Sequence, residues 1–420
     1  MQVLSVCGGM PLRGTAVIHG AKNSVLPVLA ACVLCRSPCV LHNCPNIDDV
    51  ESALQILRHL GCTAARSGST VCVDASGMDA CQIPPELAGK MRSSIIFLGA
   101  ILSRLGCAEL ALPGGCPLGE RPIDLHIAAL RQMGAECVCS PDCVCCRAAR
   151  LHGAVIALPF PSVGATENAL LAALGCGETI EIQNAAREPE ITDLVRFLQS
   201  AGAEISGGGT SKLTVCGGTP LHGTTYTILP DRVETASFLC AAAGCGGDVT
   251  LVRTSRTALS AVCSVLEGCG CEISSGRDSL RIRAPRRLRA SRETIVTAPY
   301  PGFPTDVQAP MMAALLRAEG ESRICETIFE NRFHHVPQLR KLGADIALCG
   351  QTACIRGTER LRGAALHAED LRGAMALVIG ALQSEEESTI TGIKHLRRGY
   401  DNLEENLRAL GADVKCVEIC

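Results

Sequence analysis

The sequence contains no tryptophan, and aromatic residues make up only 2% of its 420 positions. Proteins that bind single-stranded nucleic acids stack the bases on aromatic side chains, so this shortage argues against a nucleic-acid partner. The formal charges also nearly cancel, leaving a net charge of −3. With no excess of positive charge to attract polyanions, any anionic ligand must be held by a local group of basic side chains.

Long hydrophobic runs are absent as well. No continuous apolar stretch approaches the roughly 18 residues that a membrane span requires. Residues 1–9 also lack the basic start and the continuous apolar run of a signal peptide. We therefore expect a cytoplasmic protein without a membrane partner. Apolar residues make up 47% of the chain, which is sufficient for sizeable cores in two or three domains.

The motifs of several common cofactors are missing too. The sequence contains no GxGxxG pattern, no Walker loop and no HExxH pattern, which argues against dinucleotide, P-loop and zincin chemistry. We expect neither a cofactor nor a metal ion. Any chemistry must then come from the side chains and the substrates.

Cysteine, by contrast, is abundant, with 27 residues. Thiols stay reduced in the cytoplasm, so most of them are expected to pack as small hydrophobic residues. Five cysteines between Cys137 and Cys146 alternate around Ser140-Pro-Asp142, which favours a hairpin over a zinc site. Cys32 and Cys35 have the spacing of a redox motif, but their apolar surroundings favour packing along a helix.

One cysteine has different neighbours. The segment 112–126 reads LPGGCPLGERPIDLH and sets Cys116 close to Arg121 and Asp124. Its glycines and prolines interrupt helices and strands, so we expect an exposed, mobile loop. A thiol near cationic groups ionises below its usual pKa and can serve as a nucleophile or a proton donor. Cys116 is therefore a candidate functional residue, whereas most cysteines of this chain are expected to be structural.

A helix-ending pattern of leucine, two residues, an apolar residue and glycine occurs six times. The six glycines are Gly61, Gly134, Gly202, Gly270, Gly343 and Gly411. Each of the last three lies 209 residues after its counterpart among the first three, so the chain is a tandem duplication of a triplicated unit. Each glycine suits a left-handed helix cap, and strand-like alternation follows it.

This repetition predicts an α/β fold of two similar domains, each built from three repeated α/β units. A unit of about 70 residues cannot bury a core alone, so three units should share one. The boundary between the domains is expected near Leu229-Pro230. A cleft between the two domains is the default place for a ligand.

Several polar clusters interrupt the apolar periodicity, and each has a structural alternative. Lys22-Asn23 precedes an apolar helical run, where a helix N-terminus attracts anions, but a solvated lysine beside a helix cap would look the same. Ser162-Val-Gly-Ala-Thr166 suits either a helix cap or a phosphate site. Asp306 lies in a proline-rich turn, where most aspartates are caps, although a general base is the alternative.

Three arginines are further candidates: Arg92, Arg372 and Arg398. Isolated arginines are mostly surface residues. The arginine fork nevertheless suits bidentate recognition of carboxylate and phosphate groups.

Taken together, these motifs resemble those of the UDP-N-acetylglucosamine 1-carboxyvinyltransferases, the enolpyruvyl transferases that open bacterial peptidoglycan synthesis. The matching segments cover essentially the whole chain: 21–23, 112–116, 121–126, 161–166, 229–232, 301–306, 330–333 and 398–400. The resemblance implies an inside-out α/β barrel arrangement in two domains of three repeats each. It implies domains at 22–229 and at 1–21 plus 230–420, with the active site in the cleft between them.

The implied reaction transfers the enolpyruvyl group of phosphoenolpyruvate to the 3'-hydroxyl of UDP-N-acetylglucosamine and releases phosphate by addition and elimination. The resemblance implies that Cys116 donates a proton to C3 of phosphoenolpyruvate. It implies that Asp306 accepts the proton of the hydroxyl group. Lys22, Arg121 and Arg398 would neutralise the phosphate and the carboxylate, and we count Lys22 and Arg398 with Cys116 and Asp306 as catalytic.

The remaining implied contacts complete the two substrate sites. Arg92 and Arg372 would complete the phosphoenolpyruvate pocket. The positions that match contacts to the UDP-sugar are Asn23, Arg121, Pro122, Ile123, Asp124, Leu125, Ser162, Val163, Gly164, Asp306 and Ile328. The resemblance implies no cofactor, no metal, no nucleic acid and no membrane partner, and it leaves the oligomeric state open.

One departure and two alternatives remain. Phe160 stands where some members of the family carry a basic residue near the nucleotide, which leaves the contacts to the diphosphate open. The first alternative is the shikimate-pathway enolpyruvyl transferase, against which the Pro-Gly-Gly-Cys116 loop argues. The second is a non-catalytic paralogue that binds the UDP-sugar as a regulator, which would be expected to lose catalytic residues that are all present here.

Overall fold

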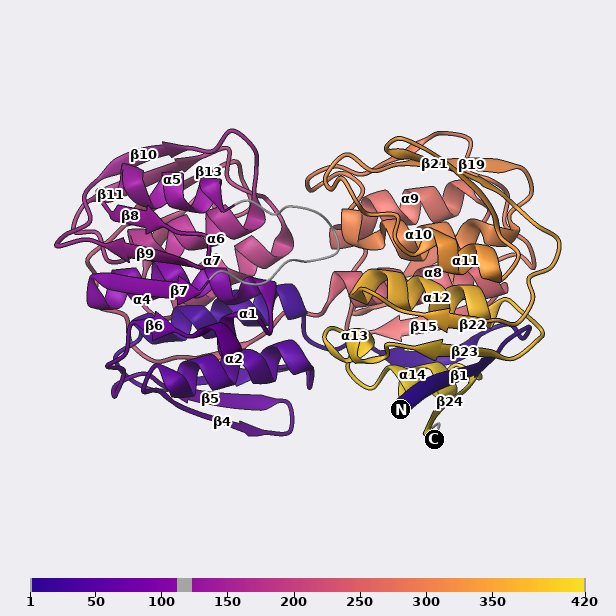
Figure 1. The fold of residues 1–420 in the computed structure, drawn as a ribbon, viewed down its shortest axis with the longest axis horizontal. Coiled ribbons are helices and arrows are strands. Elements are labelled where there is room, and N and C mark those ends of the chain that lie inside the picture. The colour runs from indigo at the N-terminus through magenta and orange to yellow at the C-terminus, as the bar shows by residue number, and fades with distance from the viewer. Residues whose placement is uncertain (1, 112–122, 419–420) are drawn as a thin grey trace. The chain divides into compact units, whose positions relative to one another are not determined.

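The computed structural model describes residues 2–111 and 123–418. The chain divides into two compact units (Figure 1). The central unit consists of the described residues between Gly20 and Leu229, and the terminal unit contains residues 2–19 together with residues 230–418. The chain therefore passes from one unit to the other at Gly20 and again at Pro230.

Each unit contains three four-stranded sheets among its described residues, with one parallel and two antiparallel pairings in each sheet. The strands of the central unit are named in hydrogen-bonded order. The first sheet contains β14 (Thr225–Thr227), β3 (Cys39–His42), β5 (Thr70–Asp74) and β4 (Thr63–Ser67), and the second contains β6 (Gln82–Ile83), β7 (Cys107–Ala111), β9 (Cys143–Arg147) and β8 (Glu136–Cys139). The third sheet contains β10 (Ala154–Ala157), β11 (Thr179–Gln183), β13 (Lys212–Cys216) and β12 (Glu204–Ser206).

The sheets of the terminal unit follow the same plan. The first sheet contains β2 (Arg13–Val17), β15 (Asp248–Val252), β17 (Ser279–Arg283) and β16 (Glu272–Ser275), and the second contains β18 (Ile295–Val296), β19 (Glu321–Cys325), β21 (Thr352–Arg356) and β20 (Asp345–Cys349). The third sheet contains β22 (Ala365–His367), β23 (Ser388–Thr391), β1 (Gln2–Cys7) and β24 (Asp413–Glu418).

Two helices accompany each sheet. The inner helices, which lead into the second strand, are α1 (Lys22–Ala31), α4 (Phe97–Leu105), α6 (Val163–Ala173), α8 (Arg232–Cys245), α10 (Gln308–Ala314) and α12 (Leu371–Leu382). The outer helices, which follow that strand, are α2 (Asp48–His59), α5 (Asp124–Gln132), α7 (Pro189–Ser200), α9 (Ser260–Gly268), α11 (Val336–Lys341) and α14 (Leu403–Ala409).

Short helical turns fill the connections. They are α3 (Pro85–Ala88), α13 (Lys394–Arg397), η1 (Cys32–Leu34), η2 (Arg92–Ile96), η3 (Thr257–Leu259), η4 (Thr305–Val307) and η5 (Leu315–Arg317).

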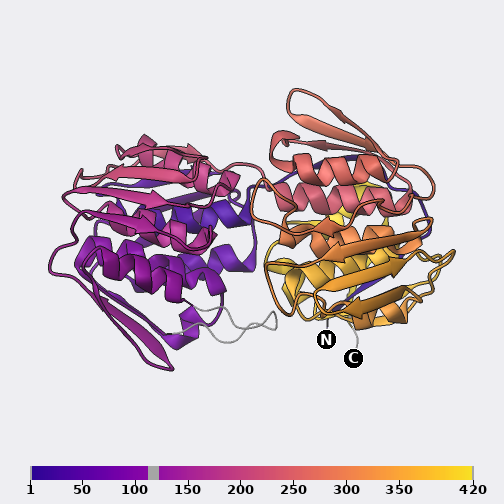
Figure 2. The ribbon, with the colours of Figure 1, turned by 90° about the horizontal axis from the view of Figure 1, so that it is seen from above.

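The inner helices form the centre of each unit. In the terminal unit α8, α10 and α12 contact one another, and the sheets lie outside them (Figures 1 and 2). Every residue of α12 from Arg372 to Leu382 is buried, as expected for a helix surrounded on all sides. Each unit has its own hydrophobic core. The predicted inside-out α/β architecture, with three repeats sharing one core, is confirmed.

The predicted left-handed caps are also confirmed. All six repeat glycines have φ between +85° and +104°, a conformation that glycine adopts without strain. After the glycine, the chain turns back on the helix: the Cys62 amide donates to the Leu57 carbonyl at 3.0 Å, and the Ala412 amide donates to the Leu407 carbonyl at 3.0 Å. The leucine of the repeat pattern thus receives the closing hydrogen bond of the cap.

Two sheets are completed by strands from distant parts of the sequence. Strand β14 pairs in parallel with β3, so residues at the end of the central unit begin its first sheet. Strand β1 pairs with both β23 and β24, so the N-terminus completes the last repeat of the terminal unit.

The structure agrees with the interpretation of the cysteine clusters. Strands β8 and β9 form the predicted hairpin, and Cys32 and Cys35 are buried. The cysteines of the described residues are free of disulfide bonds, and these residues contain no group of three or more metal-ligating side chains that could hold an ion.

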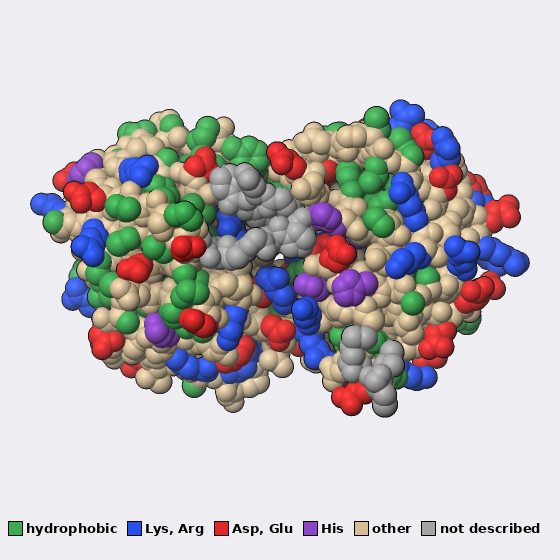
Figure 3. All heavy atoms as spheres, in the orientation of Figure 1, with side chains coloured by type: hydrophobic (Ala, Val, Ile, Leu, Met, Phe, Trp, Pro, Cys, Tyr) green, Lys and Arg blue, Asp and Glu red, His purple; other side chains and the backbone are tan. Residues whose placement is uncertain are grey.

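Two further findings concern the described surface and helices. Basic and acidic side chains are interspersed on the face of each unit drawn in Figure 3, in keeping with the balanced net charge.

No helix in residues 2–111 and 123–418 has the length and apolar character needed to cross a membrane.

Candidate active site

The predicted anion site in the central unit is built on a buried ion pair. Helix α1 begins at Lys22, as predicted, and Asn23 is its half-buried second residue. The Lys22 Nζ atom lies 2.7 Å from Oδ2 of Asp49, and the two side chains are 11% and 2% exposed. Asp49 thus holds the ammonium group at a helix N-terminus, the end that attracts anions.

The sequence reasoning missed Asp49. It lies in the first turn of α2, next to Asp48. Acidic residues in that position commonly interact with the helix dipole at the surface, so the sequence gives no signal that this carboxylate is buried against Lys22.

The segment 162–164 forms the start of helix α6. Ser162 is the N-cap, and its Oγ accepts a hydrogen bond from the Ala165 amide at 3.3 Å. Val163 and Gly164 are half-buried. A Cβ atom on Gly164 would lie 3.0 Å from Cε1 of His126, so this turn packs closely against the imidazole. The predicted capping role is confirmed, and the same turn meets helix α5.

A defined hydrogen-bond chain orients the buried imidazole of His126. The Gly99 amide donates to Oδ1 of Asn168 at 2.7 Å, which fixes the orientation of the side-chain amide. The Nδ2 group of Asn168 therefore faces Nδ1 of His126, at 2.6 Å, and the imidazole nitrogen must accept. Burial, and then the charge of Arg92, lower the pKa of His126 to about 4.

The candidate residues of the central unit therefore gather around His126. Arg92 opens the turn η2 and is half-buried. Helix α5 places Asp124 close enough to affect the pKa of His126, and Ile123 and Leu125 flank Asp124 as half-buried residues. Helix α1 contacts η2. A cationic and hydrogen-bonding environment of this kind suits an anionic ligand.

In the terminal unit, the candidate base Asp306 lies between two arginines. Its Oδ1 atom is 2.7 Å from Arg332, and its Oδ2 atom is 3.0 Å from Arg372. The arginine side chains are 3% and 6% exposed, whereas that of Asp306 is 29% exposed. Two buried guanidinium groups thus orient a carboxylate that remains open to solvent on one side.

Arg372 is fixed by the start of helix α12. The N-cap Asp370 accepts hydrogen bonds from the amides of Arg372 and Gly373 at 2.9 and 3.0 Å. Burial disfavours the guanidinium charge, but the Asp306 carboxylate and Tyr400 more than compensate, so the pKa of Arg372 is raised. Its Nη1 group also donates to the Tyr400 hydroxyl at 3.4 Å. Arg372 therefore remains a cation.

Glu326 connects the Asp306 turn to Ile328. This glutamate is 1% exposed and accepts from the Thr305 hydroxyl at 2.9 Å and from the Ile328 amide at 2.9 Å. The sequence reasoning missed both Glu326 and Arg332. For Arg332, the sequence contains one indication of a role at the site, its place within the family-like segment 330–333. For Glu326 the sequence contains no such indication.

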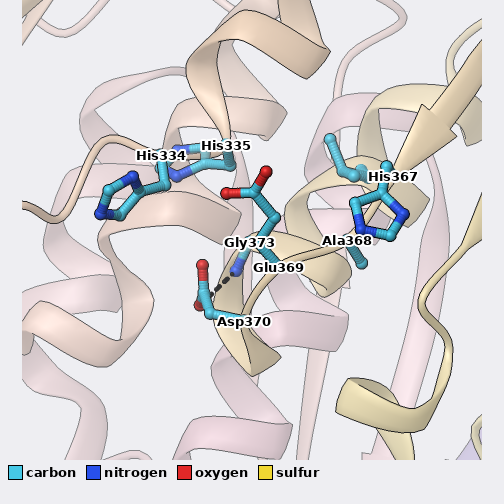
Figure 4. A pocket seen from close by; sticks show the side chains of 8 residues that line it. His334, His335, His367, Ala368, Glu369, Asp370 and Gly373 are labelled. Atoms are coloured by element: carbon cyan, nitrogen blue, oxygen red, sulfur yellow. Dashed lines mark hydrogen bonds between the residues drawn. The ribbon is translucent and has the colours of Figure 1, made fainter. Parts of the chain in front are cut away.

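Arg398 follows the short helix α13 and is half-buried. It contributes, after burial and Lys394, to the lowered pKa of His395. A neighbouring pocket is lined by His334, His335 and Asp370 among others (Figure 4). Its volume of about 10 Å³ is close to the minimum that one water molecule requires, so the pocket as it stands is too small for a substrate.

Three predicted site residues, Cys116, Arg121 and Pro122, lie outside the described residues. Phe160, where the family pattern varies, is 43% exposed. Most of the other predicted residues form two groups. Arg92, Asp124 and the segment 162–164 lie near His126, and Asp306, Ile328 and Arg372 are linked to the two buried partners Arg332 and Glu326. Lys22 and Asn23 start helix α1, where Lys22 pairs with Asp49, and Arg398 lies near His395.

A family model described as EPSP synthase (3-phosphoshikimate 1-carboxyvinyltransferase) matches residues 6–407 of this chain. Among curated proteins, the chain is 45% identical over 415 residues to a UDP-N-acetylglucosamine 1-carboxyvinyltransferase 2 from Caldanaerobacter subterraneus subsp. tengcongensis. The match covers 99% of both chains.

Solved structures give the same picture. The enolpyruvyl transferase NikO from Streptomyces tendae is 27% identical, with a TM-score of 0.89 over 100% of this chain and 99% of that one. An EPSP synthase from Acinetobacter baumannii has a TM-score of 0.74 over the whole of both chains. At 19% identity, the second likeness concerns the fold alone.

Proposed function

This chain belongs to the EPSP synthase family of enolpyruvyl transferases, and from this premise we propose that it transfers the enolpyruvyl group of phosphoenolpyruvate to the 3'-hydroxyl of UDP-N-acetylglucosamine. The reaction releases phosphate and is the first committed step of peptidoglycan synthesis. The acceptor rests on one observation, the 45% identity over 99% of the chain to a relative that is named for this sugar nucleotide. Both substrates are cytoplasmic metabolites, so we assign the protein to the cytoplasm.

The cationic candidates account for binding of phosphoenolpyruvate. This substrate carries its phosphate and its carboxylate within a few bonds of each other, so their charges repel unless cations compensate them. We assign this role to Lys22, Arg121 and Arg398, with Arg92 and Arg372 completing the pocket. The buried partner Asp49 supports the assignment of Lys22, because it orients the ammonium group at the start of α1.

Asp306 is assigned as the acceptor of the hydroxyl proton. Attack of the 3'-oxygen at C2 of phosphoenolpyruvate requires that oxygen to lose its proton, while C3 gains one from Cys116. The two arginines orient the Asp306 carboxylate, with 29% of the side chain still exposed. Asp306→Asn, which is nearly isosteric, is expected to lower turnover at least 10²-fold, a typical contribution of general base catalysis.

We assign binding of the UDP-sugar to a second set of positions. Asn23, the run 121–125, the segment 162–164 and Ile328 supply backbone and side-chain hydrogen-bonding groups. Small residues such as Gly164 let a ligand approach the backbone closely. The exposed ring of Phe160 provides no charge for the diphosphate.

The acceptor is tested by phosphate release from phosphoenolpyruvate with one acceptor at a time. We expect release with UDP-N-acetylglucosamine and none with shikimate-3-phosphate. Release only with shikimate-3-phosphate would mean that the acceptor assignment is wrong. Release with neither, despite measurable binding of the UDP-sugar, would favour a non-catalytic paralogue.

The thiol of Cys116 is tested by an epoxide that alkylates the corresponding cysteine in family members, fosfomycin. The wild-type protein is expected to be inactivated. Cys116→Ser is expected to lose turnover but to keep UDP-sugar binding, whereas Cys139→Ser, which changes an exposed cysteine, should leave both activity and inactivation unchanged. A wild-type protein that resists fosfomycin would count against an activated thiol, and loss of UDP-sugar binding in Cys116→Ser would indicate a structural loop.

A further inference from the structure

We propose that Cys137 and Cys146 form a thiol pair that low-molecular-weight disulfides, such as oxidised glutathione, convert reversibly into a cross-strand disulfide bond. The two residues face each other on the hairpin of β8 and β9. Their sulfur atoms lie 2.9 Å apart, with Cys146 as the hydrogen-bond donor and Cys137 as the acceptor. No role in the proposed transferase reaction falls on either residue.

The register of the hairpin favours this bond. The Ser140 amide donates to the Cys143 carbonyl at 2.9 Å, so residues 140 and 143 are a hydrogen-bonded pair. Hydrogen-bonded and non-hydrogen-bonded pairs alternate along antiparallel strands. Counting outward through 139 and 144, then 138 and 145, makes Cys137 and Cys146 a non-hydrogen-bonded pair. In such pairs the Cα atoms are about 4.5 Å apart, within the range that a disulfide bond spans.

The surroundings of the pair make Cys137 the attacking sulfur. It is 8% exposed, whereas Cys146 is 0% exposed, so a small disulfide reaches Cys137 first. The hydrogen bond from Cys146, and then the charge of Arg131, lower the pKa of Cys137 despite its burial. The Arg131 side chain is held there by its hydrogen bond to the Cys137 carbonyl at 2.7 Å. A thiolate is the form that attacks a disulfide.

The exchange balances without any further reagent. The Cys137 thiolate attacks one sulfur of the small disulfide, which forms a mixed disulfide and releases the other half as a thiolate. The Cys146 sulfur then attacks the Cys137 sulfur, giving up its proton, and releases the second half as a thiol. Two protein thiols are oxidised and one small disulfide is reduced to two thiol-level products. An excess of the reduced small thiol reverses both steps.

The experiment maps thiols on the full-length protein. The protein is equilibrated in glutathione buffers from fully reduced to fully oxidised, its free thiols are blocked with one alkylating agent, and the remaining cysteines are reduced and labelled with a second agent. Fragmentation of the peptide 132–147, which contains no internal lysine or arginine, locates the second label. We expect it on Cys137 and Cys146 together in the oxidised buffers, and on neither in the reduced buffer.

Variants separate the pair from its neighbours. In Cys146→Ser the reaction should stop at a glutathione adduct on Cys137. Cys139→Ser and Cys145→Ser, on the same two strands, should form the 137–146 bond as the wild type does. The proposal is overturned if the wild-type peptide carries no such bond in the fully oxidised buffer, or if the label appears instead on Cys139, Cys143 or Cys145. The wild-type result requires no substitution, so it stands even if a variant does not fold.

Discussion

Asp306, the candidate base, depends on a residue that no substrate assignment includes. Arg332 contacts Oδ1 of Asp306 at 2.7 Å and is itself buried. If it were removed, Oδ1 would lose this contact, whereas Arg372 would still hold Oδ2. Arg332 is therefore a positioning residue in our interpretation, since it acts on the reaction through Asp306.

Replacing Arg332 by methionine is expected to lower kcat by roughly 10²-fold, the typical effect of misplacing a reacting group by about 1 Å. Steady-state kinetics with both substrates varied measures the change, and KM for phosphoenolpyruvate should move much less than kcat. Arg332→Lys, which keeps a cation near the carboxylate, should recover part of the loss. Arg360→Met, at an exposed position of the same unit, is the control. Unchanged kcat in Arg332→Met would refute the positioning role.

His126 makes the stability of the central unit depend on pH. Its pKa is about 4 in the folded protein, against about 6.5 in an unfolded chain. The unfolded chain binds more protons between these values, so the contribution is complete above pH 6.5 and is lost as the pH falls towards 4. The loss amounts to about 3 kcal/mol, at 1.36 kcal/mol for each unit of pKa.

Urea unfolding of the wild type and of His126→Gln between pH 4 and pH 7 measures this contribution. The glutamine can still accept the hydrogen bond of Asn168, but it does not titrate. His335, whose pKa is also lowered to about 4 by burial, lies in the terminal unit and should keep its own pH dependence. If the unfolding of the central unit had the same pH slope in His126→Gln, another group would be responsible.

The sequence predicted site residues well where a local pattern was sufficient. Ser162 as a cap and Lys22 at a helix start follow from the residues directly around them. Asp49, Glu326 and Arg332 could not be predicted in this way. Their contacts join separate elements of the fold, and the residue type alone does not show whether a charged side chain is buried or exposed.

At the scale of elements, two of the repeat glycines allow the cost of a left-handed backbone to be distinguished from the cost of a steric clash. Gly343 has φ +89°, and a Cβ atom there would meet nothing within 4 Å. Gly61 has φ +91°, but a Cβ atom would lie 2.7 Å from the Gly77 carbonyl oxygen. Both positions carry backbone strain for any residue with a Cβ atom, and only Gly61 adds a steric clash.

We therefore expect Gly343→Ala to lower the free energy of unfolding by about 1–2 kcal/mol, the cost of the left-handed conformation alone. Gly343→Asn should cost less, because asparagine tolerates this conformation. Gly61→Ala should cost clearly more than Gly343→Ala. Thermal and urea unfolding of the three variants provide the comparison, and equal losses at the two alanine positions would show that the clash is relieved by a shift of the chain at Gly77.

The elements themselves were predictable because their signals are local and repeated. A glycine after an amphipathic helix marks its end wherever it occurs, and the offset of 209 residues gave the number of repeats. The pairing of β1 with β23 and β24 was not predictable from such patterns. Strand pairing across almost the whole chain depends on which edges the rest of the fold leaves available.

At the scale of the whole molecule, the two units have separate hydrophobic cores. Leu57 and Leu266 occupy equivalent positions in the duplicated pattern, and both are 0% exposed. Each belongs to a different core. A cavity made at one of them should therefore destabilise its own unit and leave the core contacts of the other unit intact.

The variants Leu57→Ala and Leu266→Ala test this expectation, one in each unit. Each is expected to lower the stability of its own unit by about 2–5 kcal/mol, the usual cost of this truncation in a core. Amide hydrogen exchange should accelerate in α1, α4 and α6 for the first variant and in α8, α10 and α12 for the second, because exchange from a core helix reports the opening of that core. Acceleration of all six helices by either variant would mean that the units open as one cooperative structure. Confinement to one unit would mean that the duplication produced two structures that fold separately, each of which carries part of the proposed site, Lys22 in one and Asp306 in the other.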